Sequence, residues 1–197
     1  MMPARKHNLL TALAAFVLLV VAMGCASSRQ AEAGAAKSGE LSDAQIAAIV
    51  TTANQIDIDN GNLALENASH EEVKQFAERM IADHTSVNEA AVELVTRLGV
   101  TPEETDTSRG LEKSAEQTRA KMRSLSGEEF DDAYVENEVA YHEAVLQMLD
   151  EQLIPAAQNE ELKSMLKSVR PAFVAHLEHA RSIQSSLRDG SATSHAH

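Results

Sequence analysis

Three histidines, His84, His142 and His176, interrupt runs of apolar residues that repeat at helical spacing. Each lies seven residues after an alanine or a valine of its own segment. Because residues seven apart share one face of a helix, all three imidazoles are predicted to point into the protein interior. Burying imidazole costs free energy unless the ring pairs with a carboxylate, another ring or a metal ion.

Two carboxylates are placed to join these histidines. Asp57 lies at the edge of the apolar stripe of its segment, and Glu138 precedes His142 by one helical turn on the same face. Neutral imidazole combined with carboxylate suits iron, zinc, copper or manganese, so a transition metal ion is a possible cofactor. A histidine-rich mononuclear site and a metal-free, hydrogen-bonded polar layer both remain open. His179, beside the same face, is a candidate supporting group, although a solvent-facing position fits it as well.

The spacing does not match a di-iron centre of the ferritin type. Such centres use Glu-x-x-His on two helices and a glutamate on each of the other two. Ile81 and Phe173 stand where a glutamate would precede His84 and His176 by three residues. The pattern therefore disfavours a standard ferroxidase centre and predicts no catalytic residue.

Four long helical segments must position these residues. Three begin at capping boxes, which are Ser42 with Gln45, Ser69 with Glu72 and Ser126 with Glu129. We expect these helices to end near residue 67, at Gly99 and ahead of Pro155, and a fourth helix to run from about 159 to 187 with a kink at Pro171. A charged helical segment at about 108–124 is predicted to cross over on the surface.

This order predicts an all-α fold, a ferritin-like four-helix bundle with a long helical crossover between the second and third bundle helices. An up-down bundle without the crossover is the alternative. At about 1.5 Å of rise per residue, Asp57, His84 and His142 lie roughly 16 to 22 Å from the same end, and His176 lies roughly 26 Å from the other. Four helices would thus each send a polar group toward one mid-bundle layer.

The first residues follow the pattern of bacterial export signals. Arg5 and Lys6 precede the uncharged run "LLTALAAFVLLVVAMG", which ends at Cys25. The "AMGC" sequence predicts a lipoprotein signal peptide at 1–24 and lipidation of Cys25, with an uncleaved N-terminal anchor as the alternative. Residues 25–41 are predicted to form a flexible tether, 42–188 the helical bundle and 189–197 a disordered tail, whose His195 and His197 could bind metal adventitiously.

Composition excludes several classes of function. Without residues 1–24, 15 basic residues face 30 acidic ones, a net charge of −15. Such a surface repels nucleic acid and anionic headgroups, so the expected membrane contact is through the N-terminal lipid alone. Cys25 is the single cysteine, which excludes disulfides and thiol catalysis from the folded part. Ala26 in place of an aspartate favours the periplasmic side of the outer membrane in a Gram-negative host.

Three stretches resemble a known family. They are "LALENASHEEVKQFAERMIADHTSVNE", "GEEFDDAYVENEVAYHEAVLQMLDE" and "ELKSMLKSVRPAFVAHLEHARSI". Together they resemble domain of unknown function 4142, a ferritin-like bacterial domain of exported proteins described as outer-membrane or membrane proteins. The resemblance implies the fold and the three histidines, and it implies no established activity. Members often carry glutamates where this chain has Asp57 and Asp59.

Two functional hypotheses follow from the sequence. The first is a lipid-anchored envelope protein, acting in stress or as a binding module, whose histidine layer is structural or senses pH. The second is a metal-binding or oxidant-handling protein. Neither a substrate nor a protein partner follows from the residues.

Overall fold

A computed structural model of the chain describes residues 40–194. The predicted signal peptide at 1–24, the lipidation of Cys25 and nearly all of the predicted tether lie outside the described residues, as does the end of the tail. Within residues 40–194, no helix is both long enough and apolar enough to cross a membrane.

Helices α1 (Asp43–Asn67) and α2 (Glu71–Leu98) form an antiparallel hairpin. The Ser42 capping box opens α1 as expected, with the Gln45 N–H bonded to Ser42 Oγ at 3.2 Å and the Ser42 N–H to Gln45 Oε1 at 3.0 Å. The capping box predicted at Ser69 is wrong, because the hydroxyl and N–H of Ser69 bond instead to Asp131. Helix α2 ends as expected at Gly99, which adopts the left-handed conformation.

The crossover forms a helix, α3 (Asp106–Met122), which packs mainly on α1. Helix α4 (Glu128–Met148) then begins after Gly127, whose φ of 61° requires glycine. The capping box predicted at Ser126 is therefore wrong, since the chain turns at Gly127 and no side chain caps this helix.

The expected stop ahead of Pro155 is also wrong. Helix α4 continues into a π-helical turn, η1 (Leu149–Leu153), and a short helix, α5 (Ile154–Ala156), which includes the proline. A proline ring clashes with the carbonyl four residues earlier in an α-helix. The wider π turn places an extra residue before Pro155, and the chain stays helical to Ala156.

The last helix, α6 (Glu160–Ser194), contains Pro171 and continues past residue 188, where we expected the tail to begin. The Asn159 side chain opens it by accepting from the N–H groups of Glu161 and Leu162 at 2.9 and 3.1 Å. No proline or left-handed glycine follows residue 188 within the described part, so the helix has no stop signal there.

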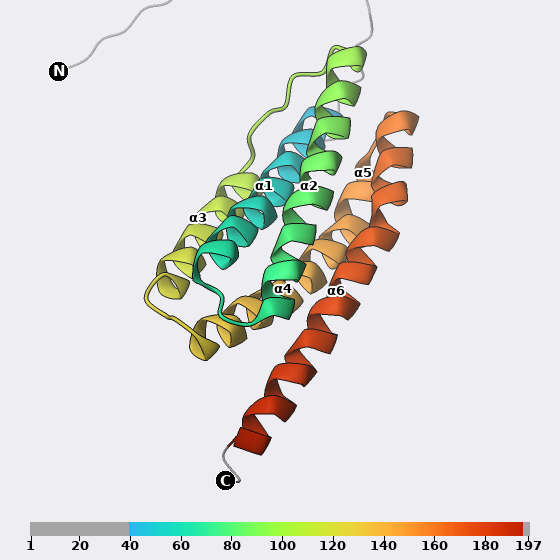
Figure 1. Ribbon diagram of the computed structural model, residues 1–197. Coiled ribbons are helices and arrows are strands. Elements are labelled where there is room, and N and C mark those ends of the chain that lie inside the picture. Colours follow the sequence, from blue (N-terminus) through green and yellow to red (C-terminus); the bar gives the residue numbers. More distant parts are fainter. Residues whose placement is uncertain (1–39, 195–197) are drawn as a thin grey trace, which may run out of the picture. The chain divides into compact units, whose positions relative to one another are not determined.

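Two aspartates connect the α1–α2 hairpin to α6 and to α4, at opposite ends. Asp43, in the first turn of α1, accepts from the N–H groups of Gln158 and Asn159 at 2.8 and 3.0 Å, at the start of α6. Asp131, in the first turn of α4, accepts from the N–H groups of Ser69 and His70 at the start of α2. Helices α1 and α6 therefore start at one end, and α2 and α4 start at the other (Figure 1). The second and third long helices, α2 and α4, run parallel. Helix α3 carries the chain from the end of α2 back to the start of α4.

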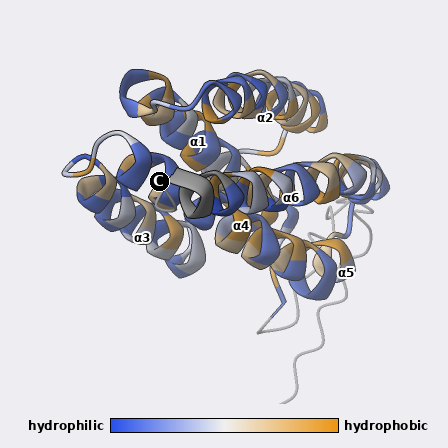
Figure 2. Ribbon diagram, turned by 60° about the horizontal axis from the view of Figure 1, so that its bottom comes forward, coloured by the Kyte–Doolittle hydropathy of each residue, from blue (hydrophilic) through white to orange (hydrophobic). Residues whose placement is uncertain are grey.

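Apolar and polar residues share each helix, as Figure 2 shows by colour. The buried apolar side chains form two clusters, one that includes Ile49, Leu149 and Leu166, and a second that includes Phe76, Phe130 and Ile183. Both clusters lie within residues 40–194, which therefore contain their own hydrophobic core. The structure confirms an all-α bundle.

Candidate functional site

A layer of buried polar residues lies along the bundle between the two apolar clusters. Its members come from all four long helices, and each is at most 3% exposed: Asn54, Asp57, Asn60, His84, Glu138, His142 and His176. The apolar periodicity of each helix turns these positions inward, because they replace core residues at the same spacing. The layer contains every metal-ligand candidate that the sequence indicated on the helices.

The three histidines meet in this layer. The ring centroids of His84 and His142 lie 5.7 Å apart, those of His84 and His176 5.3 Å, and those of His142 and His176 5.5 Å. One nitrogen from each ring lies within 4.8 Å of the other two. Phe173 covers them on one side, stacked on His84 with a centroid distance of 5.1 Å.

Each imidazole has one nitrogen with a protein acceptor. Nδ1 of His84 lies 2.8 Å from Asn54 Oδ1, and Nδ1 of His142 lies 3.0 Å from the Glu138 carbonyl oxygen. Nε2 of His176 lies 2.9 Å from Asp83 Oδ2. Since a carbonyl or carboxylate oxygen can only accept, these nitrogens carry the protons, and the other nitrogen of each ring keeps a lone pair.

The remaining nitrogen of each ring is buried without a hydrogen-bond partner. Within the described residues, Nε2 of His84, Nε2 of His142 and Nδ1 of His176 make no hydrogen bond. Buried polar atoms are nearly always paired, so three orphaned acceptors in one place call for an explanation. A group that accepts electron pairs from all three would satisfy them together.

The imidazoles are neutral at neutral pH. Burial lowers the pKa of His84 to about 2, and repulsion from His142 and His176 adds to the effect. Burial lowers the pKa of His142 to about 4. The pKa of His176 is lowered as well, by burial, and the Asp83 carboxylate partly opposes this. Neutral imidazole is the form that binds metal ions.

Asp57 and Glu138 form a buried carboxyl pair beside the histidines. One oxygen from each lies within 4.8 Å of the other and of a His142 nitrogen, and Asp57 Oδ2 is 3.5 Å from His84 Nε2. Burial raises the pKa of Asp57 well above its ordinary range, and the neighbouring Glu138 raises it further. Burial also raises the pKa of Glu138 to about 7, although hydrogen bonds from Asp57, Asn137 and Asn60 lower it in part. The pair therefore holds a proton at neutral pH.

Sequence analysis missed the groups that orient the rings. Asp83 and Asn54 bond to His176 and His84, whereas His179, the expected supporting group, is half-buried and packs edge-on against Phe76 with a centroid distance of 5.3 Å. Asn54, three residues before Asp57, could have been found as a second polar residue on the same helical face. Asp83 adjoins His84 in sequence but faces α6, which the periodicity of α2 alone does not show.

The geometry defines a class of protein, an all-α bundle with a buried layer of imidazole and carboxyl groups. A family model described as a domain of unknown function (DUF4142) matches residues 27–183. The chain belongs to this family, which confirms the resemblance seen in the sequence.

A solved structure shares the fold. The chain is similar to a DUF305 protein from Streptomyces coelicolor whose name proposes that it is secreted. The TM-score is 0.60 at 10% identity, over 73% of this chain and 91% of that chain. No curated protein matches the sequence.

Proposed function

We propose that this chain is an exported, lipid-anchored protein that binds a first-row transition metal ion at His84, His142 and His176. Two observations carry the proposal: the three buried rings each place a nitrogen within 4.8 Å of the other two, and each ring has one nitrogen without a hydrogen bond. Ligand atoms bound to one tetrahedral ion at about 2.0–2.1 Å lie roughly 3.3 to 3.5 Å apart. The imidazole nitrogens, within 4.8 Å of one another, need only a small inward movement to reach that spacing.

The hydrogen bonds on the other nitrogens fit the same role. Histidines that bind metals usually donate their second N–H to a carboxylate, a main-chain carbonyl or a similar acceptor. His176 donates to the Asp83 carboxylate, His142 to a main-chain carbonyl and His84 to the Asn54 amide oxygen. Each ring is therefore held in one tautomer, which leaves the lone pair on Nε2 of His84, Nε2 of His142 and Nδ1 of His176.

The carboxyl pair would complete the coordination. Asp57 Oδ2, 3.5 Å from His84 Nε2, is placed to supply a fourth ligand once its proton leaves. A donor set of three imidazoles and a carboxylate suits zinc, copper and iron in their divalent states. It does not suit calcium or magnesium, which prefer oxygen ligands alone.

The N-terminal pattern supports export and lipid anchoring. Residues 1–24 read as a lipoprotein signal peptide ahead of Cys25, and the name of the Streptomyces coelicolor protein also proposes secretion. We infer that the bundle works on the periplasmic side of the outer membrane of a Gram-negative host.

Metal analysis tests the proposal. The segment from residue 26 onward is purified without an affinity tag, stripped with a chelator and titrated with zinc, copper or cobalt. Visible absorption of the cobalt form reports the ligand geometry. We expect one ion per chain, lost in His84→Ala and His142→Ala and kept in His70→Ala, which changes an exposed histidine at the start of α2.

A second control removes His195 and His197, so that adventitious binding by the tail is recognised. If the protein binds no stoichiometric metal and the two core variants are only less stable, metal binding is refuted. The layer would then be the structural or pH-sensing feature of the first hypothesis.

A further inference from the structure

A cavity of about 360 Å³ lies between α1, α3 and α4. Helix α3 packs mainly on α1, and the residues of α3 and α4 at the rim of the cavity, Ser114, Ala140 and Ala144, are too small to close the space between the two helices. All three are exposed, so the cavity opens to solvent. Its volume lies in the range of about 300–1,000 Å³ typical of small-molecule sites, and a small molecule can enter it from outside.

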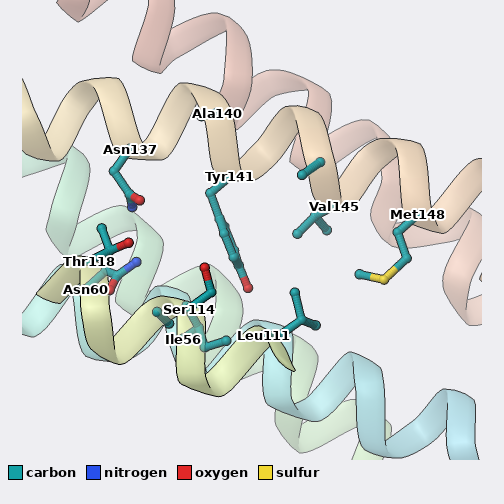
Figure 3. A pocket seen from close by; sticks show the side chains of 12 residues that line it. Ile56, Asn60, Leu111, Ser114, Thr118, Asn137, Ala140, Tyr141, Val145 and Met148 are labelled. Atoms are coloured by element: carbon teal, nitrogen blue, oxygen red, sulfur yellow. The ribbon is translucent and has the colours of Figure 1, made fainter. Parts of the chain in front are cut away.

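The lining is mostly apolar. Within residues 40–194, no charged side chain lines the cavity. Figure 3 shows Asn60, Thr118 and Asn137 gathered at one end and Met148 at the other. An ion that entered would lose hydrating water without gaining a partner of opposite charge, so the lining disfavours a charged ligand. The apolar residues come from all three helices: Ile56, Leu111, Ala115, Ala140, Ala144, Val145 and Met148.

The larger polar side chains of the lining already bond to the protein. The Tyr141 hydroxyl donates to the Ala53 carbonyl at 3.0 Å, and the Asn137 amide donates to Glu138 Oε1 at 3.4 Å. Asn60 also donates to Glu138, and it is only 2% exposed. These bonds hold the wall in place, and a ligand in the cavity therefore meets mainly apolar surface, to which the Tyr141 ring contributes.

We propose that this cavity binds a small, uncharged, apolar molecule. The volume limits the size of the ligand, the uncharged lining disfavours an ion, and the engaged polar groups favour a ligand with few hydrogen-bonding groups. Binding removes apolar surface of both the ligand and the lining from water, which is the driving force. The proposal does not depend on metal at the histidines.

A matched pair of fluorescent probes tests the predicted class of ligand. 1-Anilinonaphthalene and its 8-sulfonate share one ring skeleton and differ by a negative charge. Each is titrated into the segment from residue 26 onward, which contains both apolar clusters, in excess chelator. About 1 M salt, with a screening length of about 3 Å, suppresses repulsion by the net charge of the protein. We expect saturable one-site binding of the uncharged probe and about tenfold weaker binding, or less, of the sulfonate.

Two variants at the rim locate the binding. Ser114→Trp on α3 and Ala140→Trp on α4 each place a large side chain at an exposed position, so the fold should tolerate both, as circular dichroism would verify. Each should weaken binding of the uncharged probe about tenfold or more. Lys113→Trp, at the adjacent exposed position outside the cavity, should leave the affinity unchanged.

Three results would each overturn the proposal. The first is that the uncharged probe does not bind, and the second is that the sulfonate binds as tightly. The third is that binding of the uncharged probe survives both Ser114→Trp and Ala140→Trp, which would place it elsewhere on the protein.

Discussion

The carboxyl of Glu138 makes stability depend on pH in a direction that can be measured. Burial raises its pKa from the ordinary 4.5 to about 7, so the folded protein holds this proton more tightly than the unfolded chain. Its contribution to stability is therefore complete below about pH 4.5 and is lost as the pH rises through about 7. A pKa difference of one between the folded and unfolded chain corresponds to about 1.4 kcal/mol, which gives a loss of about 3 kcal/mol over this interval.

Glu138→Gln keeps the shape of the side chain and removes the titration. The stability of the variant relative to the wild type should rise by about 3 kcal/mol between about pH 4.5 and about pH 8. Urea unfolding followed by circular dichroism, with chelator present, measures the free energy at each pH. The histidines titrate in both proteins, so their contributions largely cancel. The difference reports the Asp57–Glu138 pair as a unit, because Glu138 also raises the pKa of Asp57.

The matched control is Glu136→Gln, which removes a carboxylate from the exposed face of the same helix. Its stability should follow that of the wild type across the whole range. If the Glu138→Gln curve also stays parallel to the wild type, the buried carboxyl does not hold its proton as the geometry requires, and the reasoning fails.

Three further outcomes follow from the fold and the site. Asp131→Ala should lower the free energy of unfolding by about 3 kcal/mol, because it removes the acceptor for two main-chain N–H groups at the start of α2. Urea unfolding measures this loss, with Asp132→Ala at the adjacent exposed position as the control. A loss no larger than that of the control would contradict the prediction. Gly61→Ala should destabilise by about 1–3 kcal/mol, since the new methyl would lie 2.8 Å from a side-chain carbon of α2. Gly110→Ala, with nothing within 4 Å, should stabilise by up to about 1 kcal/mol, and thermal melts showing one sign for both glycines would refute the packing argument. Asp83→Asn should weaken metal binding about 10- to 100-fold in equilibrium dialysis, and unchanged affinity would exclude its orienting role.

Helix positions were largely predictable because apolar spacing determines which face of each segment is buried. The starts of α2 and α4 could not be predicted, because they depend on tertiary contacts and backbone geometry that a local sequence pattern does not contain. Ser69 has the composition of a capping box, but its partner lies 62 residues away in Asp131. The π turn before Pro155 was missed for a similar reason, because the local sequence does not show that the helix widens ahead of this proline. The ferritin-like relationship remains a prediction.

The three histidines could be found because each interrupts an apolar repeat. Their orientation could not be found, because it depends on Asn54 and Asp83, which belong to other helices than the rings they contact. The apolar periodicity also could not predict the cavity between α1, α3 and α4, which Asn60 lines. This cavity arises from the distance between α3 and α4 and not from the face of either helix.

The carboxylates of Asp43 and Asp131 also limit how far the α1–α2 hairpin can slide past α4 and α6. A slip of one residue would move an imidazole by about 1.5 Å along its helix and rotate it by about 100°. Such a slip would break two main-chain hydrogen bonds at one end of the bundle or the other. The two aspartates therefore act as axial stops, and they keep His84, His142 and His176 at a single height although neither aspartate belongs to the layer.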